Sequence, residues 1–183
     1  MEKHGTERLE TERLVLRRFT QDDVAAMYAN WASDPQVTRY LTWPPHASVE
    51  ATRAVLAQWE TQYADPGFLQ WAIVPRGLGE PIGSISVVRW RDEVEQAEFG
   101  YCIGRAWWGQ GYTSEALAAV RDYLFDRVGI RRLQGCHASD NPASGAVMRK
   151  CGLAYEGTLR GADRNNTGVC DMCVYGMLRD DPR

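Results

Sequence analysis

The sequence predicts an α+β fold built on one mixed, mostly antiparallel sheet of about seven strands, flanked by about four helices. Segments in which apolar and polar residues alternate indicate half-buried strands, and segments in which apolar residues recur every three or four positions indicate amphipathic helices. These segments follow one another as strand, helix, helix, three strands, helix, strand, helix and two strands. No break in composition divides the 183 residues, so we expect a single domain spanning 1–183.

The most informative stretch is a strand, a loop and a helix in the middle of the chain. The strand covers 97–103, and its alternation places Glu98 on a face of small residues. The loop 104–113 follows it. A helix with an apolar stripe then begins near Ser114.

Two glycines, Gly109 and Gly111, precede this helix. Glycine lets the backbone approach a bound anion closely, and the free N–H groups of a first helical turn, aided by the helix dipole, can hold a pyrophosphate. The loop is not a dinucleotide fingerprint, because no third glycine follows in register. It is not a nucleotide-triphosphate loop either, because no Lys-Ser or Lys-Thr pair follows. On its own this motif leaves a pyrophosphate site and a structural turn equally open.

The remaining elements follow from periodicity and from proline, glycine and capping signals. Pro44 and Pro45 make the stretch 40–46 an irregular loop, which the sequence leaves open as a substrate wall or as an edge of the core. Asn141 as the cap and Pro142 at the first helical position begin the last helix. The expected elements are a strand at 14–19, helices at 20–31, 48–63 and 142–150, strands at 69–73, 82–90 and 132–138, and two final strands at 154–160 and 169–178 joined by a polar loop at 161–168.

Charge and hydropathy narrow the class of partner. A formal net charge of −3 and a pI near 5.7 argue against a nucleic-acid-binding surface, and no basic cluster interleaved with aromatic residues occurs. No apolar run approaches the roughly 20 residues of a membrane span. The N-terminus has no apolar signal region behind it. We therefore expect a cytoplasmic protein that binds neither nucleic acid nor a membrane.

The five cysteines are an odd, scattered set that fits reduced thiols better than a disulfide framework. Cys170 and Cys173 have the spacing of redox and zinc motifs. In a strand, however, residues three apart point to opposite faces, so the two sulfurs cannot converge. No second pair occurs at zinc spacing and the three histidines are scattered. The sequence predicts no metal site.

Three blocks of sequence share a pattern with one family. The blocks are Leu9-Glu10-Thr11-Glu12-Arg13-Leu14-Val15-Leu16-Arg17, Tyr101-Cys102-Ile103 with Trp107-Trp108-Gly109-Gln110-Gly111-Tyr112-Thr113-Ser114-Glu115-Ala116, and Asn141-Pro142-Ala143-Ser144 with Lys150-Cys151-Gly152-Leu153. They resemble the GNAT N-acetyltransferases, in the branch that contains the ribosomal-protein N-terminal acetyltransferases RimJ and RimL. The family's pyrophosphate loop reads Gln/Arg-x-x-Gly-x-Gly/Ala. This chain departs from that pattern at the first position, Ala106, and keeps both glycines.

The resemblance implies the GNAT fold, with the sheet splayed at the cofactor site, and acetyl-CoA as co-substrate. The pantetheine arm would lie between the Glu98 strand and the His137 strand, where backbone groups around residues 102–104 would bind it. The branch also leads us to expect a homodimer. The cofactor-binding residues that the resemblance implies are Cys102, Ile103, Gly104, Trp108, Gly109, Gln110, Gly111, Tyr112, Thr113, Asn141 and Ser144.

The resemblance also implies three catalytic residues. Glu98 matches the strand position that often supplies a general base, and Asp163 falls where the RimL-like branch carries an acidic residue. Ser144 matches a serine that faces the cofactor sulfur and could donate a hydrogen bond to the departing thiolate. Each also has an ordinary structural interpretation, as a strand-end carboxylate, a turn residue and a first-turn helix residue respectively.

The predicted function is direct acetyl transfer from acetyl-CoA to a primary amine, which we take to be the α-amino terminus of a protein or peptide. An α-amino group, with a reference pKa near 8, needs only a weak base, whereas lysine at about 10.4 needs a stronger one. A small-molecule amine, such as an antibiotic or a polyamine, is the alternative acceptor. A non-catalytic acyl-CoA-binding module is the alternative from another class.

Overall fold

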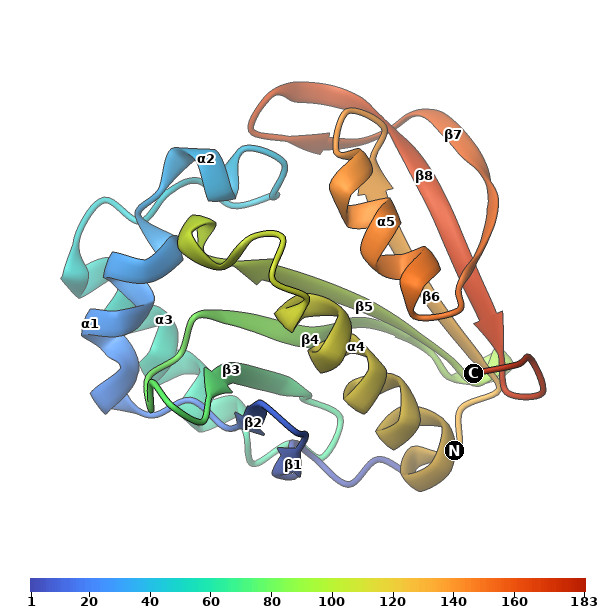
Figure 1. Cartoon of the computed structure of the whole chain (residues 1–183), viewed down its shortest axis with the longest axis horizontal. Helices are drawn as coiled ribbons and strands as arrows, with labels where there is room; N and C mark the ends of the chain where they lie inside the picture. Colours follow the sequence, from blue (N-terminus) through green and yellow to red (C-terminus); the bar gives the residue numbers. More distant parts are fainter.

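The computed structural model describes all 183 residues, which form one mixed sheet of eight strands and helices on both of its faces (Figure 1). The strand order is β1-β2-β3-β4-β5-β6-β8-β7, and every neighbouring pair is antiparallel except β5 with β6. The strands are β1 (Leu9–Glu10), β2 (Leu14–Arg17), β3 (Gln70–Pro75), β4 (Gly83–Arg91), β5 (Gln96–Ile103), β6 (Arg132–Ala138), β7 (Ala154–Asn165) and β8 (Gly168–Leu178).

The helices cover the two faces of this sheet, with α4 and α5 on one face and α1 and α3 toward the other (Figure 1). None of them combines the length and the apolar character that a membrane crossing requires. The helices are α1 (Val24–Met27) with its extension η2 (Tyr28–Ala32), α2 (Pro35–Thr38), α3 (Val49–Gln62), α4 (Tyr112–Asp122) with its extension η5 (Tyr123–Val128), and α5 (Pro142–Lys150).

Alternate residues of the strands serve two separate hydrophobic clusters. Leu14, Leu16 and Trp71 belong to the larger cluster, which also contains the apolar stripe of α4. Val15 and Ala72 face the other way, into the smaller cluster with α1 and α3. Because side chains alternate along a strand, two apolar faces explain why these strands are apolar almost throughout.

The parallel pair β5 and β6 comes apart in the middle of the sheet, as the family resemblance implied. Residues 96–99 pair with residues 132–135, and the pairing stops there. Beyond this point β5 stays paired only with β4, as far as Ile103, and β6 stays paired only with β8, as far as Ala138. The second half of β5 therefore presents an unpaired edge inside the sheet.

Three predicted features differ from the structure. The polar loop expected at 161–168 is instead a continuation of β7 and β8, with only residues 166 and 167 between them. This hairpin is largely exposed, so its pairing does not need the apolar alternation that signals a half-buried strand. α4 begins at Tyr112 rather than near Ser114, because Gly111 adopts the left-handed conformation that caps it. The eighth strand, β1, is too short to leave a periodic signal.

Candidate active site

The loop between β5 and α4 has the backbone of an anion cradle. Gly109 and Gly111 have φ angles of +73° and +83°, in the left-handed region that favours glycine. Trp108, 48% exposed, donates from Nε1 to the carbonyl of Ile103 at 2.9 Å and ties the loop back to β5. The sequence-predicted glycine pair thus occupies positions where a side chain would strain the backbone.

The first turn of α4 offers free N–H groups beside two cations. The first hydrogen bond of the helix runs from Glu115 N to the Gly111 carbonyl at 3.0 Å, and the amides of residues 112–114 have no backbone partner. A methyl group placed on Gly111 would lie 3.4 Å from Arg13 Nη2 and 3.9 Å from Lys150 Nζ. The site therefore combines helix-terminal amides with a guanidinium and an ammonium group, as an anion requires.

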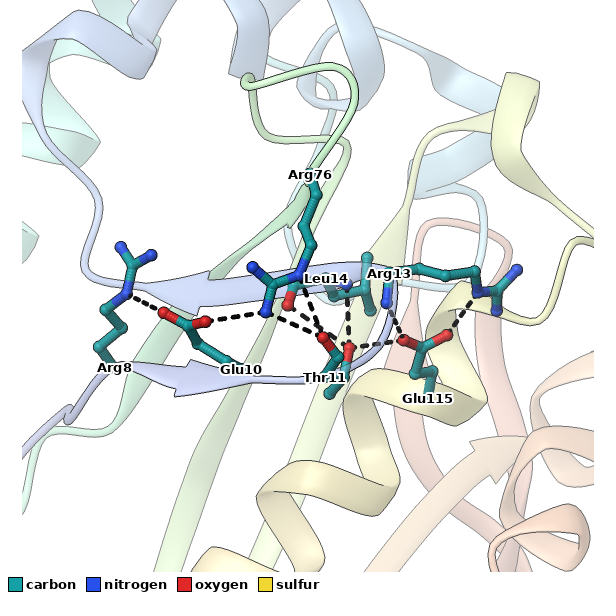
Figure 2. A network of polar contacts seen from close by, with 7 residues as sticks. All are labelled: Arg8, Glu10, Thr11, Arg13, Leu14, Arg76 and Glu115. Atoms are coloured by element: carbon teal, nitrogen blue, oxygen red, sulfur yellow. Dashed lines mark hydrogen bonds and ion pairs between the residues drawn. The ribbon is translucent and has the colours of Figure 1, made fainter.

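Arg13 is held in this position by a polar network that joins the β1–β2 hairpin to α4 (Figure 2). Its Nε donates to Glu115 Oε2 at 2.6 Å and its Nη1 donates to the Gln110 carbonyl at 3.1 Å. The guanidinium also lies 4.6 Å from the centre of the Tyr112 ring. Burial alone would raise the pKa of Glu115, but hydrogen bonds from Thr11 and Arg13 and the positive charge of Arg13 lower it overall. Glu115 is therefore ionised at neutral pH.

The unpaired edge of β5 leads from this cradle into the sheet. Gly104 N donates to the Ile82 carbonyl at 2.8 Å, so Gly104 and Cys102 direct their backbone groups toward β4. Hydrogen-bonding direction alternates along an antiparallel strand, and the amides of Tyr101 and Ile103 therefore face the opening left by β6. Of the three residues predicted to bind pantetheine through their backbone, Ile103 has its amide at this edge. Tyr101 is a further such residue that the sequence did not single out.

The N-terminus of α5 lies across the opening and carries two predicted site residues. Asn141 occupies the cap position, but its side chain makes no capping hydrogen bond and lines a cavity instead. The hydroxyl oxygens of Ser144 and Tyr101 lie 2.8 Å apart, and Tyr101 Oη lies 2.9 Å from the Ser144 carbonyl oxygen. Burial raises the pKa of Tyr101 far above its ordinary value. Tyr101 is therefore a neutral hydrogen-bonding partner of Ser144.

A cavity of about 600 Å³ opens where β5 and β6 part. It brings together the three predicted catalytic residues, Glu98, Ser144 and Asp163, from β5, α5 and β7. Cys102 and Asn141 also line it, while the predicted loop residues do not. The predicted cofactor-binding residues that do not line the cavity belong to the end of β5, the loop after it and the start of α4: Ile103, Gly104, Trp108, Gly109, Gln110, Gly111, Tyr112 and Thr113.

The two carboxylates that line this cavity, Glu98 and Asp163, each accept a hydrogen bond from the protein. Glu98 Oε2 accepts a hydrogen bond from Gln134 at 3.3 Å, and the exposed Asp163 accepts one from the backbone of Arg164 at 2.7 Å. The negative charges of both carboxylates affect the pKa of the Cys136 thiol. Burial, followed by the negative charges of Glu98 and Asp163, raises the pKa of Cys136 to about 11. This thiol is protonated at neutral pH and is a poor nucleophile.

The opposite wall of the cavity is aromatic and comes largely from the predicted irregular loop. Tyr40, Trp43 and His46 line it, so the loop contributes to the cavity wall, and Trp43 also packs on the smaller hydrophobic cluster. His46 Nδ1 lies 2.8 Å from Thr52 Oγ1, and burial lowers the pKa of His46. The imidazole is therefore neutral near pH 7 and does not repel a cationic acceptor.

Comparison with known proteins identifies the family. Residues 13–154 match the acetyltransferase (GNAT) domain, and the chain belongs to this family. It is an N-acetyltransferase, and the non-catalytic alternative is set aside.

Similar proteins extend over almost the whole chain. The uncharacterized N-acetyltransferase YoaA of Bacillus subtilis (strain 168) is 32% identical over 93% of this chain and 96% of its own length. The ribosomal-protein-serine acetyltransferase of Escherichia coli (strain K12) is 26% identical over 93% and 95%. The solved structure of RimL, a ribosomal L7/L12 α-N-protein acetyltransferase in complex with coenzyme A, has a TM-score of 0.83 at 24% identity, covering 94% of this chain and 98% of that one. The last comparison supports the fold.

Proposed function

We propose that the protein transfers an acetyl group from acetyl-CoA directly to the α-amino group of a peptide or protein N-terminus. One observation carries the proposal. The loop with the proposed anion cradle follows the C-terminal end of β5, and the same strand carries the unpaired edge and lines a cavity that contains two carboxylates and a serine. This arrangement supports a donor site at one end of the opening in the sheet and an acceptor site at the other.

The residues present fit acetyl-CoA. The left-handed glycines leave the cradle free of side chains, and Arg13 and Lys150 would hold the pyrophosphate together with the first amides of α4. The amides of Tyr101 and Ile103 would bind the pantetheine arm. The bound co-substrate supplies an activated acyl group and a thiolate leaving group.

Glu98 and Asp163 are the two candidates for removing the proton from the attacking amine. Glu98 stands one residue before the point where β5 and β6 part, and Asp163 faces the same cavity from the hairpin. We favour Glu98, because its strand leads directly to the thioester site. A modest base is sufficient for an α-amino group, whose reference pKa is near 8.

Ser144 is the candidate donor to the departing sulfur. Its hydroxyl has Tyr101 as a partner, and the single hydrogen of the Tyr101 hydroxyl has two acceptors in reach, the Ser144 carbonyl and Ser144 Oγ. When Tyr101 donates to Oγ instead of to the carbonyl, the serine hydrogen is free to point at the sulfur. Such a donor stabilises charge that develops only in the transition state. Tyr101 therefore positions Ser144 without touching the reacting atoms.

A small-molecule amine is the second candidate acceptor, and the shape of the cavity favours it. Tyr40 and Trp43 form an apolar wall, and the loop that carries them is joined to the β7–β8 hairpin by hydrogen bonds. A partly enclosed apolar pocket with a few polar groups is typical of a small-molecule site.

A matched acceptor panel tests the proposal. We expect a peptide with a free α-amino terminus to be acetylated faster than the same peptide with a blocked terminus and a single lysine, at saturating acetyl-CoA. An aminoglycoside and a linear polyamine complete the panel, and thiol release together with product mass is measured. Preference for the blocked peptide, or turnover confined to the small molecules, would contradict the N-terminal acceptor and leave amine acetylation standing. No thiol release with any amine would contradict the whole proposal.

A further inference from the structure

One residue joins the two walls of the acceptor cavity. The turn between β7 and β8 lies beside the loop that connects α2 to α3 (Figure 1), and Asn166 is a residue of this turn. Its side-chain Nδ2 donates to the carbonyls of Thr38 and Trp43, each at 2.8 Å, and its backbone N donates to the Leu41 carbonyl at 3.2 Å. Both hydrogens of the side-chain amide are therefore used on carbonyls five residues apart.

These three hydrogen bonds are the whole polar connection between the two walls. No other hydrogen bond and no ion pair joins residues 161–168 to residues 38–48. The turn is ordered independently, because Asn165 Oδ1 accepts from both the backbone and the hydroxyl of Thr167 at 2.8 and 2.7 Å. Loss of the Asn166 side chain would thus remove two of the three bridging hydrogen bonds and loosen the loop without dismantling the hairpin.

The bridge lies at the cavity, because residues on both of its sides line that cavity. Tyr40, Leu41 and Trp43 contribute from the loop, and Asp163 and Asn165 contribute from the hairpin. Asp163 and the loop residues that Asn166 holds therefore lie around the same cavity. The apolar wall suits the body of a slender chain, and the carboxylate suits its terminal ammonium group.

We propose that Asn166 sets an upper limit on the size of the acceptor. With its hydrogen bonds in place, the cleft admits a primary amine at the end of a slender, extended chain and excludes an amine carried on bulky linked rings. This inference rests on the proposed amine acetylation and deepens it by naming the class of acceptor. Asn166 acts through the wall position and takes no part in the chemistry.

The test compares Asn166→Asp with wild type. Aspartate has nearly the same size as asparagine, but it lacks the two N–H donors and turns an oxygen toward two carbonyls. Thr167→Ala is the matched control, because it changes the same turn and leaves all three bridging hydrogen bonds intact. Asn166→Ala serves as a second variant that carries no new charge. The acceptors are a linear polyamine, a peptide with a free α-amino terminus and an aminoglycoside.

Two readouts are expected to change together. Hydrogen exchange of residues 38–46 should become faster in both Asn166 variants and stay unchanged in Thr167→Ala. The ratio of kcat/KM for the aminoglycoside to kcat/KM for the slender amines should rise roughly tenfold in the same variants. Faster exchange with an unchanged ratio would overturn the size limit alone, and unchanged exchange would show that Asn166 does not hold the loop. Absence of transfer to every amine by the wild type would overturn the proposed function as well.

Discussion

Replacement of Tyr101 by phenylalanine offers the sharpest test of the proposed catalytic arrangement. The change removes one hydroxyl group, which lies 2.8 Å from Ser144 Oγ and 2.9 Å from the Ser144 carbonyl oxygen, and keeps the ring in the larger hydrophobic cluster. The ring also stacks on Phe99, with centroids 5.9 Å apart, and this contact survives the substitution. The perturbation is therefore confined to the orientation of Ser144.

The expected magnitude follows from the lost hydrogen bond. A net contribution of about 0.5–1.5 kcal/mol for one such bond corresponds to a fall in kcat of roughly 2- to 13-fold. Ser144→Ala removes the donor itself and should cost on the order of 10- to 1,000-fold in kcat, with little change in the KM for acetyl-CoA. If Tyr101 acts only through Ser144, the double variant should be no slower than Ser144→Ala, because there is then no serine to orient.

The assay is a double-mutant cycle on kcat, measured where chemistry limits the rate and with folding checked by denaturant unfolding. Because burial raises the pKa of Tyr101, its hydroxyl stays protonated throughout an ordinary assay range. The ratio of wild-type to Tyr101→Phe rates should therefore not change with pH. Fully additive effects of the two substitutions, or loss of a basic limb in Tyr101→Phe, would refute the reasoning and make Tyr101 a proton donor in its own right.

Three further outcomes are expected. Gly111→Val should abolish acetyl-CoA binding in calorimetry, because the φ of +83° is strained for valine and its side chain would enter the space beside the cradle cations; near-normal affinity in a folded variant would remove the cradle assignment. Of Glu98→Gln and Asp163→Asn, the one that replaces the true base should lose the acidic limb of kcat/KM, and retention of that limb in both would point to deprotonation by solvent. Gly145→Ala should destabilise the protein by about 1–3 kcal/mol, because the new methyl group would lie 2.5 Å from Nε2 of the buried His137; an unchanged denaturation midpoint would contradict this packing.

Periodicity predicted most of the fold because most of its elements bury a face. The helix beginning after Ser48 is confirmed, and Ser48 accepts from the Ala51 amide at 3.3 Å as its cap. The order of the central strands is also confirmed. The exposed end of the β7–β8 hairpin was missed because strands without a buried face carry no alternation. Backbone pairing sets Asp163 opposite Cys170 there.

Only those parts of the candidate site that belong to a local sequence motif could be predicted from the sequence. The glycines before α4 and the helix start at Asn141 carry their own signals within a few residues. Arg13 and Lys150 lie about a hundred and about forty residues from Gly111 in the sequence, and only the packing of β2 and α5 against α4 brings them together. The bridging role of Asn166 was likewise invisible, since an asparagine in a turn has an ordinary local explanation.

The position of residues on β5 has a consequence for how the acceptor specificity of such proteins changes in evolution. The Tyr101 hydroxyl meets Ser144 of α5 on one face of the sheet, while Glu98, three residues earlier on the same strand, projects from the other face, and both residues line the cavity. One irregular loop and one exposed hairpin contribute part of the lining of this cavity, and strands and helices contribute the rest. Substitutions at the exposed positions of these two segments can change the proposed acceptor pocket while both hydrophobic clusters stay intact. A duplicated copy of this chain could therefore acquire a new acceptor by changes in two surface segments, and its acetyl donor would be inherited unchanged.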